Sequence, residues 1–94
     1  MMFSRDLRDL VALGEVTVSI RLWTRPHVKV GGRYRTAGVV IEIDSLEVLP
    51  FSAVTADDVA ASGETDLEAL RHRAAHSGPI NDHTLVHRVE FHVV

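Results

Sequence analysis

Residues 16–23 contain side chains that could bind an anion and a nucleic-acid base, and they are spaced as in a β-strand. Apolar and polar residues alternate from residue 16 to residue 22, which predicts a half-buried strand. Ser19, Arg21 and Trp23 share the other face of this strand. A guanidinium group suits phosphate oxygens, and an indole offers a surface on which a base can stack. The segment therefore predicts a cleft for RNA or a nucleotide.

Basic residues continue beyond this strand. Residues 16–41 contain no acid, whereas residues 36–70 contain eight acids and no lysine or arginine, so the net charge of −3 hides a dipolar sequence. Such a basic segment is typical of an anion-binding surface, although charge runs are often only solvated. We predict that the ligand-binding set is Ser19, Arg21, Trp23, Arg25, Lys29, Arg33 and Arg35.

Arg21 and Trp23 also have purely structural interpretations. Arg21 could form an internal salt bridge with Glu42 or Glu90. Trp23 is the only tryptophan of the chain and could lie in the core or in a dimer contact. These interpretations make Arg21 and Trp23 parts of the scaffold instead of ligand contacts.

Histidines are the other chemically active residues, because the chain contains six of them and no cysteine. His72 and His76 have helical i, i+4 spacing, but the stretch between them contains no glutamate and no third ligand is near. His87 and His92 point to opposite faces of a predicted strand. No phosphate-binding or dinucleotide-binding glycine motif is present. We therefore predict no metal site and no cofactor.

Grouped strands, not strands alternating with helices, position these residues. We expect a helix over 5–13 capped by Ser4. After the first strand we expect two more strands, over 33–36 and 39–49. A helix over 56–62 capped by Thr55 follows, then a second helix that starts at a Thr65–Glu68 capping box and ends near His76, and a last strand over 85–93. This order predicts an α+β fold: one domain over residues 1–94, built as a small, mostly antiparallel, partly closed β-barrel with an N-terminal helix and two short helices before the last strand.

The stretch from Gly14 to Arg21, Gly-Glu-Val-Thr-Val-Ser-Ile-Arg, carries a family resemblance. Together with Leu-Trp after it and His-Val-Lys-Val-Gly-Gly-Arg-Tyr-Arg over 27–35, it resembles the ASCH domain of the PUA-like superfamily, which has Gly-x-Lys-x-x-Thr-x-Arg after its first helix. The order of elements resembles that family over residues 5–94. The resemblance implies a small β-barrel associated with RNA.

Some small bacterial ASCH proteins resemble amidohydrolases that act on acetylcytidine through the motif Lys, the motif Thr and a Glu in the helical pair, and others are associated with ribonuclease activity. In this sequence Ser19 replaces the Thr, and Glu64 is the carboxylate nearest to the Glu position. Ser19 and Glu64 are therefore the catalytic candidates if the chain is a hydrolase. Val16 occupies the Lys position and can neither activate a hydroxyl nor stabilise an oxyanion, which leaves enzymatic activity open.

We therefore expect an ASCH-like module that binds RNA, a nucleotide or a nucleoside without the family's amidohydrolase catalysis. The alternative is a hydrolase acting on acetylcytidine or on single-stranded RNA. A second alternative is a homodimeric interaction protein with a vestigial cleft. The sequence shows neither a signal peptide nor a transmembrane segment, so we expect a cytoplasmic protein with no membrane partner.

Overall fold

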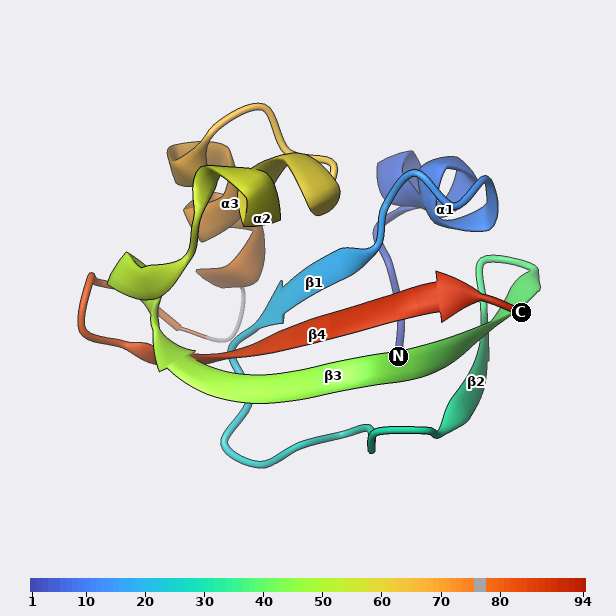
Figure 1. The fold of residues 1–94 in the computed structure, drawn as a ribbon. Coiled ribbons are helices and arrows are strands. Elements are labelled where there is room, and N and C mark those ends of the chain that lie inside the picture. Colours follow the sequence, from blue (N-terminus) through green and yellow to red (C-terminus); the bar gives the residue numbers. More distant parts are fainter. Residues whose placement is uncertain (76–77) are drawn as a thin grey trace.

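The fold is a curled antiparallel sheet with three helices along one side (Figure 1). A computed structural model describes residues 1–75 and 78–94. Four strands, β1 (Val18–Arg21), β2 (Arg33–Thr36), β3 (Val39–Pro50) and β4 (Leu85–Val93), lie in the order β1-β4-β3-β2, and every neighbouring pair is antiparallel. The α+β class and the order of elements are confirmed, and the sheet closes only as far as a half-barrel.

Strand β1 is shorter than the predicted 16–22, because the backbone amides before it are hydrogen-bonded to helices and not to β4. Helix α1 (Arg5–Ala12) ends in a turn in which the amides of Glu15 and Val16 both donate to the carbonyl of Leu10. The amide of Thr17 then donates to the carbonyl of Ala61, at the end of α2 (Ala56–Ala61). Regular pairing with β4 therefore begins only at Val18.

Two apolar clusters hold the helices on the sheet. One joins α1 to the middle of the sheet, with Val11, Ile41 and Phe91 almost completely buried. The other packs α2, α3 (Leu67–Ala74) and the 3₁₀ turn Phe51–Ala53 against β1 and the start of β4. Strand β1 lies between α1 and the α2–α3 pair, as Figure 1 shows.

The two short helices begin differently from each other. Thr55 caps α2 as predicted and forms a capping box with Asp58, in which each side chain accepts from the other residue's backbone amide. The capping box predicted at Thr65–Glu68 is wrong, since Asp66 caps α3 and accepts from the amide of Ala69 at 2.7 Å. The predicted helix end at His76, and with it the His72–His76 pair, lies outside the described residues.

A β-bulge interrupts the longest strand pair. Ile43 pairs with Phe91 and Ser45 pairs with Glu90, so Asp44 is the extra residue on β3.

Within residues 1–75 and 78–94, no helix combines the length and the apolar character needed to cross a membrane.

Candidate functional site

A pocket of about 540 Å³ lies at β1, between the N-terminal residues with α1 on one side and α3 on the other. All four residues of β1 line it, together with residues 2–4 and Leu7 on one side and residues of α3 on the other. We call this hollow the β1 pocket. Its volume falls in the range of about 300–1,000 Å³ typical of small-ligand sites. Of the described residues that line it, Arg21, His72 and Arg73 can be cationic and none is acidic.

Arg21 is held in the β1 pocket by uncharged partners. Its Nε donates to Ser19 Oγ at 2.6 Å, its Nη2 donates to the carbonyl of Met2, and its guanidinium lies 5.1 Å from the centre of the Phe3 ring. Among the described residues no carboxylate pairs with it. Burial lowers the pKa of Arg21, but an arginine remains protonated at neutral pH. The pocket therefore contains a positive charge that no acid of the described chain neutralises.

The internal salt bridges proposed for Arg21 from the sequence do not form. Glu42 pairs instead with Arg33, and Glu90 pairs with Arg88. Ser19 and Arg21 do lie together on one face of β1, as the alternation predicts, and both line the β1 pocket.

Sequence reasoning missed the two basic residues on the opposite wall. His72 is exposed on α3, and Arg73 is half-buried and pairs with Asp6 of α1 and with Glu64. They lie about 50 residues from Arg21 along the chain, in a segment whose basic residues follow a long acidic run. Their helical spacing carries no anion-binding motif, so only the packing of α3 beside β1 reveals them.

The remaining predicted ligand residues lie outside the β1 pocket. Trp23 is half-buried against the core, with His27 stacked on its ring at 4.5 Å and His87 tilted against it at 5.6 Å. The core interpretation of Trp23 therefore fits better than that of a stacking surface in this pocket. The four loop and β2 residues are exposed, and none lines the pocket: Arg25, Lys29, Arg33 and Arg35.

The catalytic candidates are not brought together as a reactive pair. Ser19 is buried, and in the described part of the chain its hydroxyl is hydrogen-bonded only to Arg21. A guanidinium cannot take a proton from a hydroxyl. Glu64 binds Arg73 Nε at 2.8 Å and lines a separate hollow beside α2, not the β1 pocket.

Val16, the residue that the resemblance to the ASCH domain places where that family has a lysine, is a core residue. Its side chain is 2% exposed and packs in the cluster of α1. Gly63 lies directly over it: a Cβ on Gly63 would come within 2.9 Å of Val16 Cγ2 and within 3.0 Å of Leu7 Cδ2. The close approach of the turn after α2 thus depends on a small residue at 63 and an apolar side chain at 16.

A group of potential metal ligands lies elsewhere, on the outer face of β3 and β4. Glu42 is directly opposite His92 in the sheet, and the bulge residue Asp44 binds His92 Nδ1 at 2.8 Å. Their ligand atoms lie within 4.8 Å of one another, the only such group among the described residues. Glu42 also binds Arg33 Nε at 3.0 Å, so an ion pair and the Asp44–His92 hydrogen bond already occupy this group.

Comparisons with known proteins bear on the fold. No protein-family model and no curated protein matches the chain. The solved structures it resembles include an ASCH domain from Lactobacillus crispatus JV V101, with a TM-score of 0.72 and 24% identity, covering 94% of this chain and 70% of that one. A DUF984 protein from Enterococcus faecalis V583 has a TM-score of 0.75 and 17% identity, covering 95% of this chain and 67% of that one. This chain therefore has the fold of an ASCH domain.

Proposed function

We propose that this protein binds RNA or a nucleotide in the β1 pocket and that Arg21 contacts a phosphate group of the ligand. The observation that carries the proposal is the charge of the pocket: Arg21 lies in it without a carboxylate partner among the described residues, and the described lining includes no acid. Arginine is well suited to such a role, because its fork of N–H donors matches phosphate oxygens. The resemblance to the ASCH domain supports the same ligand class.

Hydrolysis is less well supported than binding. The position that the resemblance assigns to a catalytic lysine is filled by Val16, which lies in the core. Glu64 does not line the pocket and accepts a hydrogen bond from Arg73. Among the described residues the Ser19 hydroxyl forms no hydrogen bond to a histidine or a carboxylate that could act as its base. These observations favour a binding module over an amidohydrolase or a ribonuclease.

The test is a fluorescence-anisotropy titration with a labelled single-stranded RNA hexamer, with uridine 5′-monophosphate as a competitor. Arg21→Ala should weaken binding about 10-fold or more, since a hydrogen bond to a charged group contributes about 1.5–3 kcal/mol. Arg25→Ala is the matched control, because it removes the same charge from an exposed loop position outside the pocket. The melting temperature of each variant shows whether it is folded.

Three outcomes are distinct. Weaker binding with Arg21→Ala alone supports the β1 pocket. Equal losses with both variants assign the ligand to a diffuse basic surface, against the proposal. Absence of binding, with a dimer by size-exclusion chromatography, favours the interaction protein with a vestigial cleft. Analysis of the same RNA on a denaturing gel, and of acetylcytidine by mass spectrometry, reports any hydrolysis.

A further inference from the structure

Arg73 holds an internal carboxylate at the β1 pocket. Its two terminal nitrogens donate to the two oxygens of Asp6, at 3.1 and 2.8 Å, in the paired arrangement that arginine also forms with phosphate. Its Nε donates to Glu64 at 2.8 Å. The two acids come from different elements, since Asp6 is in the first turn of α1 and Glu64 precedes α3.

The two contacts differ in exposure. The Glu64 side chain is 5% exposed, whereas the Asp6 side chain is 64% exposed. A buried contact of this kind is costly to break, while an exposed ion pair contributes little and exchanges readily with solvent ions. The Glu64 contact therefore fixes Arg73 in place, and the Asp6 contact is the one that another anion can replace.

The Asp6–Arg73 pair also connects the two walls of the pocket. Leu7, the neighbour of Asp6, lines one wall, and Arg73 lines the other. Because Asp6 belongs to α1 and Arg73 to α3, this contact links the two helices that contribute to the lining of the pocket. An anion bound between the walls would compete with Asp6 for the guanidinium.

We propose that Asp6 acts as an internal competitor of the ligand, and that a phosphate group displaces its carboxylate from Arg73 when the ligand binds. This inference rests on the proposed function and makes it more specific. A neutral nucleoside has no anionic group to exchange for Asp6, whereas a phosphorylated ligand has one, and Arg73 and Arg21 both line the pocket in which it would bind. The β1 pocket should therefore select nucleotides, free or in RNA, over nucleosides.

The hydrogen bond from Arg73 lowers the pKa of the Asp6 carboxyl, in agreement with this geometry. Asp6 is thus ionised throughout the neutral range and competes there at full strength. The competition should be weak enough for a ligand to overcome, because Asp6 is mostly exposed.

Isothermal titration of the full chain with uridine 5′-monophosphate tests the inference. Asp6→Asn removes the competing charge and should tighten binding roughly two- to fivefold, the range expected for an exposed ion pair. Asp9→Asn is the matched control: it removes the same charge one turn further along α1, and Asp9 forms no ion pair among the described residues. Arg73→Gln and the double variant Asp6→Asn/Arg73→Gln complete a cycle, in which the gain from Asp6→Asn should vanish.

Titrations with uridine and with a single-stranded RNA hexamer separate the sources of the phosphate. Binding of the monophosphate and the RNA but not of uridine supports the inference, and equal binding of uridine overturns the selection for phosphate. If the wild type binds but Asp6→Asn behaves as Asp9→Asn does, the competition is refuted and the proposed function stands. If neither the wild type nor Asp6→Asn binds any of the three, both proposals fail.

Discussion

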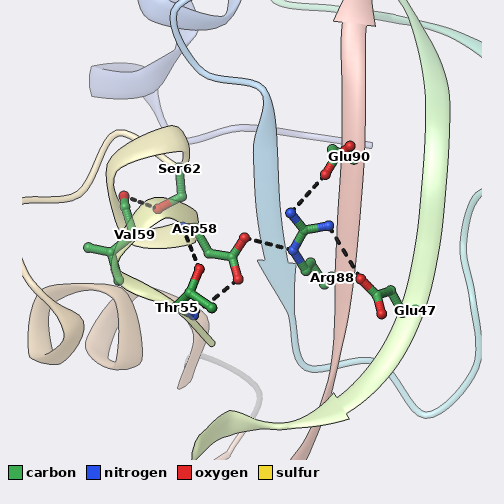
Figure 2. A network of polar contacts seen from close by, with 7 residues as sticks. All are labelled: Glu47, Thr55, Asp58, Val59, Ser62, Arg88 and Glu90. Atoms are coloured by element: carbon green, nitrogen blue, oxygen red, sulfur yellow. Dashed lines mark hydrogen bonds and ion pairs between the residues drawn. The ribbon is translucent and has the colours of Figure 1, made fainter. Parts of the chain in front are cut away.

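Replacement of Arg88 by methionine should test how α2 is fixed to the sheet. Arg88 of β4 donates from Nε to Asp58 of α2 at 2.7 Å and from Nη2 to Glu90 at 2.7 Å, with a longer contact to Glu47 at 3.4 Å (Figure 2). The Asp58 side chain is 7% exposed and the Arg88 side chain 16%. Arg88→Met keeps most of the apolar stem and removes the charge that faces Asp58.

The expected loss is about 3 kcal/mol in the free energy of unfolding. Removal of one partner from a buried ion pair costs about 3–5 kcal/mol. The lower end applies, because Asp58 keeps a hydrogen bond from the amide of Thr55, and Glu90 and Glu47 are too exposed to add much. In a domain of this size, 3 kcal/mol corresponds to roughly 12–24 °C in melting temperature. Glu47→Gln, the control, should cost less than about 0.5 kcal/mol.

The pH dependence of this loss gives a second measurement. Burial raises the pKa of Asp58, but hydrogen bonds from Thr55 and the charge of Arg88 outweigh it and hold the pKa below the ordinary value of 3.8. A carboxyl with a lowered pKa stabilises the fold above pH 3.8, and this contribution is lost as the pH falls through its folded-state pKa. Urea unfolding, followed by circular dichroism, should therefore show a gap between wild type and Arg88→Met that is widest near neutral pH and narrows below pH 4.

Two results would refute this reasoning. One is an Arg88→Met protein that melts within about 2 °C of the wild type. The other is a gap in unfolding free energy that stays constant down to pH 3. Either result would mean that Arg88 does not stabilise the ionised carboxylate of Asp58. The double variant Asp58→Asn/Arg88→Met should recover part of the loss, because no unpaired buried charge remains.

Two further predictions concern His87 and Gly63. Burial and the nearby charge of His27 lower the pKa of His87 below 6.5, so the unfolded chain takes up this proton first and stability should fall as the pH drops below about 6.5. His87→Leu should flatten that decline by up to about 1.4 kcal/mol per pH unit in urea unfolding, and identical slopes would contradict the prediction. Gly63→Ala should cost about 1–3 kcal/mol more than Gly14→Ala: both glycines have φ near +80°, but only at Gly63 would the added Cβ press on Val16. Equal melting temperatures for the two alanine variants would show that Gly63 is not tightly packed.

Local signals in the sequence predict most of the fold. Residues 33–36 and 85–93 are strands with the predicted bounds, and Gly63 and Thr55 mark the ends of α2. Such features depend on alternation, glycine and capping chemistry within a few residues. The start of β1 was predicted two residues early, because the backbone of residues 15–17 is bound by α1 and α2, and no local pattern shows a contact with an element 40 residues away.

The candidate site was predicted only where one strand supplies it. Ser19 and Arg21 are two residues apart on β1, so alternation alone places them together. The opposite wall comes from α3, and the basic run over residues 25–35 drew the prediction toward a loop that lies outside the pocket. Charge clustering along the chain says little about charge clustering in space once the chain turns. His72 and Arg73 follow an acidic run, and their approach to β1 depends on the packing of Leu70 and Ala74 in the core.

The motif from Gly14 to Arg21 serves two separate purposes in this fold, and this separation favours binding over catalysis. Its first half follows the end of α1, and there Val16 packs against Gly63. Only its second half, residues 18–21, lines the pocket. A lysine at position 16 would have to bury its charge in a cluster of apolar side chains or displace the turn after α2. The packing that stabilises this turn is therefore incompatible with a lysine at position 16, while Ser19 and Arg21 keep their place on β1. Introducing a lysine at position 16 should therefore destabilise the protein, and a pocket whose Arg21 has no carboxylate partner among the described residues is suited to hold an anion.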